Sequence, residues 1–246
     1  MKHVFIITYG RTGSTALMKA LNSIEGACLR GENGGLLRPL AEAFMISQRS
    51  RRRHGAASGP VSHPWYGAGE MRPHRFGASL AQAFTRDVLA PPEGTRLTGF
   101  KEIRYTADGL TDQAFRGILR FMLTQFEESR VIFLTRNPEE VADSAWWQTR
   151  DRDIVIDVLD ATIERFRHAH EDFPEQTFLL DHASFNSDPE GLRPLLQWLG
   201  EEIPPEALAA ALAERVAEAS GTGSPDEEDA DASEDTEPEL AADLSH

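Results

Sequence analysis

The chain contains only one cysteine and no long apolar run, and each of these scarcities excludes some classes of protein. Cys28 has no second cysteine to pair with, so neither a disulfide nor a thiolate zinc site is expected. No stretch approaches the roughly 18 apolar residues of a membrane span, and the first apolar run is too short for the core of a signal peptide. We therefore expect a cytoplasmic protein without a membrane span.

Bases are absent from the C-terminal end of the chain. The 246 residues hold 40 Asp and Glu against 25 Lys and Arg, a net charge of -15, but ten of the acids lie in residues 220–246. Low hydrophobicity and uncompensated charge predict a disordered acidic tail there, after one domain over residues 1–219. That domain is close to neutral. A nucleic-acid partner is not expected, because such proteins carry a basic face that neutralises phosphates.

Short β-branched and aromatic runs alternate with helical periodicity along the domain. This alternation predicts an α/β fold with three layers, in which a mostly parallel sheet has helices on both faces. The segment 49–75 is rich in Arg, Gly, Pro and His, and we expect it to form a long loop or lid over one end of the sheet. The expected strands span residues 3–8, 27–30, 96–100, 130–135 and 177–180. The expected helices span residues 15–24, 36–48, 76–89, 111–126, 138–148, 154–173 and 189–199.

A glycine-containing turn joins the first expected strand to the first expected helix. The N–H groups at a helix N-terminus are unpaired and the helix dipole attracts negative charge, so this position is typical of phosphate and sulfate sites. Gly10 and Gly13 permit close approach of an anion, and Arg11 adds a forked cationic contact. The hydroxyl groups of Ser14 and Thr15 are further donors. An ordinary capped turn without a ligand is the alternative.

The turn departs from the loop of nucleoside triphosphatases, which reads G-x-x-x-x-G-K-[ST]. Counted from Gly13, the first glycine of that pattern falls on Thr8 and its lysine on Ser14. Both defining positions differ, so hydrolysis of ATP or GTP is not expected.

A second anion-binding pattern follows the fourth expected strand. Arg136 ends the strand, Asn137 and Pro138 are typical of a helix start, and Ser144 comes two turns later. Strand ends and helix starts meet at the carboxyl edge of an α/β sheet, where ligands bind. Arg136 and Ser144 are therefore candidates for a second phosphate, unless Arg136 only pairs with a nearby carboxylate such as Glu140.

Together these segments resemble the sulfotransferases that use 3′-phosphoadenosine 5′-phosphosulfate (PAPS). In that family a [KR]-[ST]-G-[ST]-[ST] loop after the first strand binds the 5′-phosphosulfate, and a strand ending in Arg, with Ser eight residues later, provides the 3′-phosphate site. The resemblance implies a P-loop-like architecture and a donor site formed by Arg11, Thr12, Gly13, Ser14, Thr15, Arg136 and Ser144.

The resemblance is greater to the carbohydrate-type and bacterial branch than to the cytosolic small-molecule enzymes. The R-K-G-x-x-G-D-W-K loop that completes the 3′-phosphate site in the latter is missing, and the C-terminus is acidic instead. Arg150 or Arg152 would have to take its place. Trp146 or Trp147 would stack near the nucleotide or acceptor, unless both belong to the core.

Sulfuryl transfer requires a base for the acceptor hydroxyl and cations near the leaving phosphate. Glu32 follows the second expected strand, and the carbohydrate-type and bacterial enzymes place a catalytic Glu at the similar position. Lys101, at the end of the third strand, and Arg11 are the expected electrostatic stabilisers. Arg104 is expected to contact nucleotide or acceptor. As an alternative, Glu32 caps the next helix or pairs with Arg30 or Arg38.

Many sulfotransferases instead use a mid-chain His as the base, so His63 is the second candidate. With Trp65 it lies on the expected loop 49–75, which would then form an acceptor pocket or lid. No spacing of His, Cys or carboxylates indicates a metal site, and the reaction needs none.

The resemblance predicts transfer of a sulfuryl group from PAPS to a hydroxyl of a carbohydrate, a lipid or a secondary metabolite. The expected partner is therefore a small-molecule or glycan acceptor. Two other functions stay open at this point. One is a nucleotide kinase or other phosphotransferase, and the other is a non-catalytic binding module that acts through the acidic tail.

Overall fold

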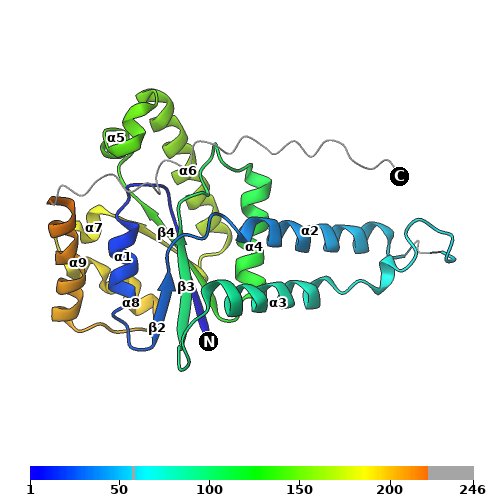
Figure 1. Ribbon diagram of the computed structural model, residues 1–246. Coiled ribbons are helices and arrows are strands. Elements are labelled where there is room, and N and C mark those ends of the chain that lie inside the picture. The colour runs from blue at the N-terminus through cyan, green and yellow to red at the C-terminus, as the bar shows by residue number, and fades with distance from the viewer. Residues whose placement is uncertain (57–58, 221–246) are drawn as a thin grey trace, which may run out of the picture.

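Five parallel strands form the centre of the molecule (Figure 1), as seen in a computed structural model that describes residues 1–56 and 59–220. The spatial order is β2-β3-β1-β4-β5, and every neighbouring pair is parallel. The expected strands are confirmed, and each observed boundary lies within two residues of its expected position. The strands are β1 (Lys2–Ile7), β2 (Ala27–Arg30), β3 (Leu97–Glu102), β4 (Ser129–Thr135) and β5 (Thr177–Asp181).

Helices cover both faces of the sheet, so the expected three-layer α/β fold is confirmed. One face carries α1 (Ser14–Leu21), α7 (Ala183–Asn186), the turn η4 (Pro189–Leu192), α8 (Arg193–Leu199) and α9 (Pro205–Ser220). The other side carries α2 (Leu37–His54), η1 (Ala68–Glu70), α3 (Pro73–Ala83), the π-helical turn η2 (Phe84–Leu89), α4 (Asp112–Gln125), α5 (Pro138–Ala142), η3 (Ala145–Thr149) and α6 (Arg152–Asp172).

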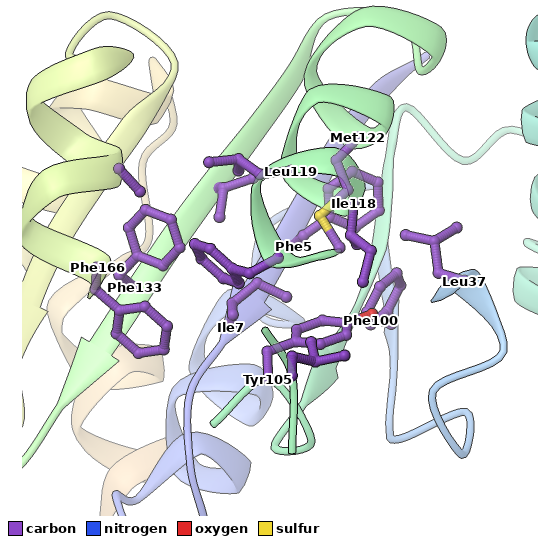
Figure 2. Close-up of a cluster of buried hydrophobic side chains, with 14 of the residues drawn as sticks. Phe5, Ile7, Leu37, Phe100, Tyr105, Ile118, Leu119, Met122, Phe133 and Phe166 are labelled. Atoms are coloured by element: carbon purple, nitrogen blue, oxygen red, sulfur yellow. The ribbon is translucent and has the colours of Figure 1, made fainter. Parts of the chain in front are cut away.

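Alternating side chains of β1 supply two separate hydrophobic cores. Val4 and Ile6 pack with α1, α8 and α9, whereas Phe5 and Ile7 point to the opposite face. Figure 2 shows that second core, where Phe5 lies 5.0 Å from the ring of Phe100. The continuous apolar run of β1 is typical of a parallel strand that is buried on both faces, as β1 is here.

The expectation of one long loop over residues 49–75 is wrong, because helices extend into both of its ends. Helix α2 continues to His54 and α3 begins at Pro73, so residues 49–54 and 73–75 are helical, and the helical turn η1 lies between them. Figure 1 shows α2 and α3 running side by side away from the sheet, with their connection at the far end rather than over the sheet. Arginine is a good helix former and its head stays in solvent, so α2 extends past its apolar stripe without help from the core.

Other elements differ in smaller ways from the expectation. The expected helix 138–148 is split into α5 and η3, and the helix α9 was not anticipated. The apolar neighbours of Cys28 in the sequence predict a buried core residue, but Cys28 is half-buried. The acidic segment from 220 lies outside the described residues except for Ser220, the last residue of α9. No helix within residues 1–56 and 59–220 is both long and apolar enough to cross a bilayer.

Candidate active site at the carboxyl edge of the sheet

The loops that follow β1, β2, β3 and β4 lie along one edge of the sheet, because parallel strands all end on the same side. From β1 the chain passes to β2 and β3 on one side, and then crosses to β4 and β5 on the other. The strand order therefore reverses between β1 and β4. Ligands of open α/β sheets bind in the crevice at such a switch point.

The loop after β1 has the properties of an anion site. In the described part of the chain, the main-chain N–H groups of residues 10–15 donate to no backbone carbonyl. Gly13 precedes α1 with a left-handed φ of 81°, which glycine adopts without strain. Unpaired N–H groups and the N-terminus of α1 together favour a bound phosphate or sulfate.

The hydroxyl groups of this loop are divided between internal and outward roles. Thr12 is fully buried, and its Oγ1 lies 2.8 Å from Thr8 Oγ1 and donates to Tyr9 O at 3.2 Å. Its hydroxyl therefore holds the shape of the loop rather than facing a ligand. Thr15, by contrast, is exposed, while Ser14 is buried at the start of α1.

Arg11 and Arg136 bring the two predicted anion-binding segments into contact. The Nε of Arg11 donates to Ser144 Oγ at 3.1 Å, and Nη1 of Arg136 donates to the carbonyl of Arg11 at 3.1 Å. Arg136 also pairs with Glu140 through Nε at 3.0 Å. The ion pair considered as an alternative therefore forms alongside the contact with Arg11. The residues expected to hold the two phosphates therefore lie next to each other.

Two aromatic residues, Tyr9 and Trp147, hydrogen-bond to the main chain around this contact, and of these Tyr9 was not assigned a role from the sequence. The hydroxyl of Tyr9 donates to Arg136 O at 2.5 Å and accepts the N–H of Arg136 at 2.8 Å. Burial raises the pKa of Tyr9 well above its ordinary value, so the phenol stays protonated as a donor. Trp147 is buried and its Nε1 donates to Gly10 O at 3.4 Å, so it belongs to the core, as the alternative to a stacking role stated. The only sequence signal for Tyr9 was an aromatic residue inside the glycine turn.

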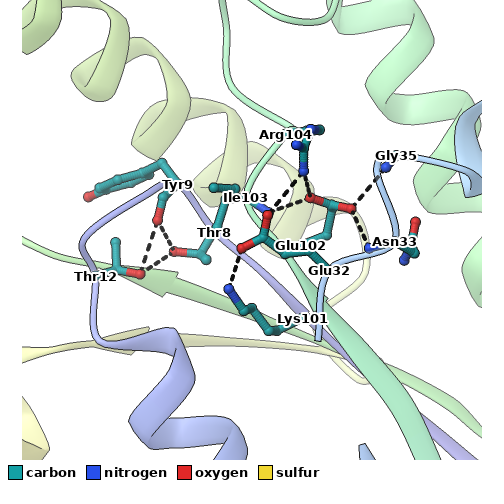
Figure 3. A network of polar contacts seen from close by, with 10 residues as sticks. All are labelled: Thr8, Tyr9, Thr12, Glu32, Asn33, Gly35, Lys101, Glu102, Ile103 and Arg104. Atoms are coloured by element: carbon teal, nitrogen blue, oxygen red, sulfur yellow. Dashed lines mark hydrogen bonds and ion pairs between the residues drawn. The ribbon is translucent and has the colours of Figure 1, made fainter. Parts of the chain in front are cut away.

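Glu32, Lys101 and Arg104 meet at the end of β3 (Figure 3). Lys101 forms an ion pair with Glu32 Oε1, and Nη1 of Arg104 lies 3.0 Å from Glu32 Oε2. All three side chains are partly exposed. The structure thus brings together the three residues that were expected to act on the transferred group and the acceptor.

The alternative partners of Glu32 are engaged elsewhere. Arg30 donates to the carbonyls of Leu89 and Ala90 at 2.8 Å each, and Arg38 pairs with Glu42 on α2 at 3.3 Å. Glu32 is therefore held by the cations of the candidate site and not by its neighbours in sequence.

Glu102 is a functional candidate that sequence reasoning missed. It is fully buried at the end of β3, and each carboxylate oxygen accepts from two donors. Burial alone would lower the pKa of Arg104, but the carboxylates of Glu102 and Glu32 raise it above its ordinary value. The sequence held one signal, an acidic residue beside Lys101 just after the expected strand 96–100.

The other predicted residues lie apart from this edge. His63 and Trp65 belong to the connection at the far end of α2, where the N–H of Trp65 donates to His63 Nδ1 at 3.1 Å. The ring of Trp65 stacks on His54 with centroids 3.7 Å apart. The 18 residues of α2 separate Glu32 from this connection, a length of roughly 27 Å at 1.5 Å per residue.

The two arginines considered for completing the phosphate site already have partners. Arg150 pairs with Asp108 at 3.2 Å and Arg152 with Asp143 at 3.0 Å, and all four side chains are at least a third exposed. Within the described residues, no three His, Cys, Asp or Glu side chains are grouped as metal ligands.

The fold is similar to that of solved sulfotransferase domains. The sulfotransferase domain of the Synechococcus PCC 7002 olefin synthase aligns over 86% of this chain and 77% of its own, with a TM-score of 0.54 and 19% identity. A sulfotransferase from Mycobacterium tuberculosis aligns over 87% of this chain and 71% of its own, with a TM-score of 0.45 and 14% identity. One from Mycobacterium avium aligns over 89% and 69%, with a TM-score of 0.43 and 14% identity. No family model and no curated protein matches the chain.

Proposed function

We propose that this protein is a sulfotransferase that moves a sulfuryl group from PAPS to a hydroxyl of a carbohydrate, lipid or secondary-metabolite acceptor. One observation carries the proposal. Arg11 of the loop after β1 touches both Ser144 and Arg136 of the segment after β4, so two separate anion-binding patterns form one site. A donor with phosphate groups at both ends of its ribose matches this pair of patterns, and the fold is consistent with the same activity.

The residues at the switch point have the chemistry that such a donor requires. The unpaired N–H groups of residues 10–15 would hold the 5′-phosphosulfate, together with Arg11 and the hydroxyls of Ser14 and Thr15. Arg136 and Ser144 would hold the 3′-phosphate. The Thr12 hydroxyl would shape the loop rather than bind the donor, since it is bonded within the loop, so Thr12 and Gly13 would contact the donor through their main-chain N–H groups.

In the proposed reaction the acceptor oxygen attacks the sulfur and the bond from sulfur to the leaving phosphate oxygen breaks. The acceptor proton goes to Glu32, and the leaving phosphate retains the electron pair of the broken bond. Lys101 and Arg11 would stabilise the charge that develops on the leaving group and sulfuryl oxygens. Because Lys101 pairs with Glu32 in the structure, we expect the donor's anionic groups to draw Lys101 away and free the carboxylate as a base.

The first test is thermal unfolding with 3′,5′-bisphosphoadenosine, the expected product. A ligand at 100 times its Kd adds about 2.7 kcal/mol of stability, which raises the Tm of a domain of this size by roughly 5–10 °C. ATP with Mg²⁺ is the comparison. No shift with the bisphosphate, or an equal shift with ATP and Mg²⁺, contradicts the proposal.

The second test separates chemistry from binding. Glu32→Gln should lower the rate of sulfuryl transfer by roughly 10²–10⁴-fold, because general base catalysis contributes that much. The Tm shift with the bisphosphate should persist. Glu42→Gln is the matched control, since Glu42 pairs with Arg38 on the surface of α2 and should leave both readouts unchanged. Transfer that survives in Glu32→Gln would assign the base to another residue.

A further inference from the structure

The carboxylate of Glu102 lies between the two halves of the candidate site. Its main chain joins the loop after β1, because the N–H of Thr8 donates to Glu102 O at 3.1 Å. Its side chain joins the loop after β2, where Oε2 accepts the N–H groups of Gly35 at 3.0 Å and Asn33 at 3.3 Å. One residue therefore connects the proposed donor loop with the loop that carries Glu32 (Figure 3).

The carboxylate of Glu102 ties the main chain of the loop after β2 to the end of β3. β2 is hydrogen-bonded to β3 only as far as the pair Arg30 and Phe100, so the ladder ends just before the loop. Gly34 and Gly35 both have left-handed φ angles, 66° and 73°, and successive N–H groups in such a turn form a concavity that attracts an anion. Both polar atoms of the Asn33 side chain are buried without a partner among the described residues, so its main chain makes the anchoring contacts.

Glu102 also reaches Glu32 through Arg104. The Nη1 of Arg104 lies 3.3 Å from Glu102 Oε1 and 3.0 Å from Glu32 Oε2, so the guanidinium is held between the two carboxylates. The other donor to Glu102 Oε1 is the N–H of Ile103, at 3.0 Å. Because both oxygens accept from donors, an amide in place of the carboxylate would direct its own NH₂ at two of these donors.

We propose that Glu102 is the positioning residue of the site, which fixes the loop of residues 31–36 and, through Arg104, the carboxylate of Glu32. This role rests on the proposed function insofar as Glu32 acts as the base. Glu102 touches neither reactant and acts through its neighbours. A fully buried carboxylate is stable only when its oxygens are satisfied, which is the arrangement found here.

The test uses Glu102→Gln, which keeps the shape of the side chain and changes its hydrogen bonding. We expect hydrogen exchange at the amides of Asn33 and Gly35 to accelerate about tenfold or more, because each would lose its buried acceptor. In the transfer assay kcat should fall by about 100-fold, as expected for a misplaced catalytic group. The KM for PAPS and the Tm shift with 3′,5′-bisphosphoadenosine should be retained.

Glu201→Gln is the matched control. Glu201 is a buried carboxylate that pairs with Lys2 and Arg96 at the opposite edge of the sheet. Its loss should lower Tm without changing exchange at residues 33 and 35 or kcat. Unchanged exchange or unchanged kcat in Glu102→Gln overturns the proposal, and so does loss of the bisphosphate shift, which would indicate general unfolding. The exchange measurement decides the positioning role even if the wild-type protein transfers no sulfuryl group.

Discussion

At the scale of single residues, Arg11 combines backbone strain with a position in the candidate site. Its φ of 70° lies in the left-handed region, which costs a residue with a Cβ about 1–2 kcal/mol. Only Ala90 and Glu128 share this property among the described non-glycine residues. Such strain persists where the surroundings enforce it and is frequent at binding sites. Here the strained backbone directs the Arg11 guanidinium to Ser144 and its carbonyl to Arg136.

Replacement of Arg11 by glycine should therefore separate stability from binding. Arg11→Gly relieves the left-handed strain, which stabilises the folded protein. The greater freedom of glycine in the unfolded chain lowers the free energy of unfolding by about 0.5–1 kcal/mol. The expected Tm is unchanged or higher by up to about 4 °C, while the Tm shift with 3′,5′-bisphosphoadenosine is lost. Glu128→Gly, at an exposed residue with a φ of 45°, is the control and should keep that shift. A full shift in Arg11→Gly would mean that the guanidinium does not contact the nucleotide.

At the scale of elements, the close approach of β1 and β3 requires a glycine. Gly99 pairs with Val4, and a Cβ at Gly99 would lie 1.7 Å from the Val4 carbonyl oxygen. Gly99→Ala should therefore push the two strands apart and cost about 3 kcal/mol or more, a fall in Tm of roughly 6–12 °C that circular dichroism would record. Gly31→Ala, where a Cβ meets nothing within 4 Å, should unfold like the wild type. Equal Tm values for the two variants would contradict the observed pairing.

The elements also show how far the sequence could predict this molecule. Strands and the loop after β1 were found because burial on both faces and glycine punctuation are local patterns. Tyr9 and Glu102 were missed because their partners are remote, at Arg136 and Gly35, and only the folded sheet brings them together. The end of α2 was misplaced because its exposed arginines follow no apolar period, although they favour a helix. Site roles assigned from the resemblance stay predictions.

At the scale of the whole molecule, the amino edge of the sheet is held by charges that respond to acid. Glu201 bridges Lys2 and Arg96 there, and the hydrogen bond from Arg96 lowers the pKa of Glu201. A carboxyl whose pKa is lowered in the folded state stabilises the protein at pH values above the pKa that it has in the unfolded chain. That contribution is lost as the pH falls through the folded pKa. The ordinary Glu value is 4.5, so this loss belongs to the acid range below it.

His3, near the same edge on β1, should make the protein sensitive to acid at a higher pH. Its ring is buried and held between Glu127 O at 2.8 Å and Thr85 Oγ1 at 3.2 Å. The carbonyl accepts from Nδ1–H, which leaves Nε2 as the acceptor of the neutral ring. Burial lowers the pKa of His3 below the ordinary 6.5. As the pH falls through 6.5, His3 binds a proton in the unfolded chain but stays neutral in the folded protein. The free energy of unfolding therefore decreases.

Urea denaturation of the wild type at pH 7.5 and 5.5 should show this decrease, and His3→Gln should show a smaller one, because glutamine does not titrate. The variant will be less stable at both pH values, since it loses buried ring contacts with Phe5 and Phe126. The informative quantity is therefore the difference between the two pH values and not the stability itself. His168→Gln, at an exposed histidine on α6, should keep the wild-type difference. An equal difference in His3→Gln would mean that His3 is not the group that takes up the proton on unfolding.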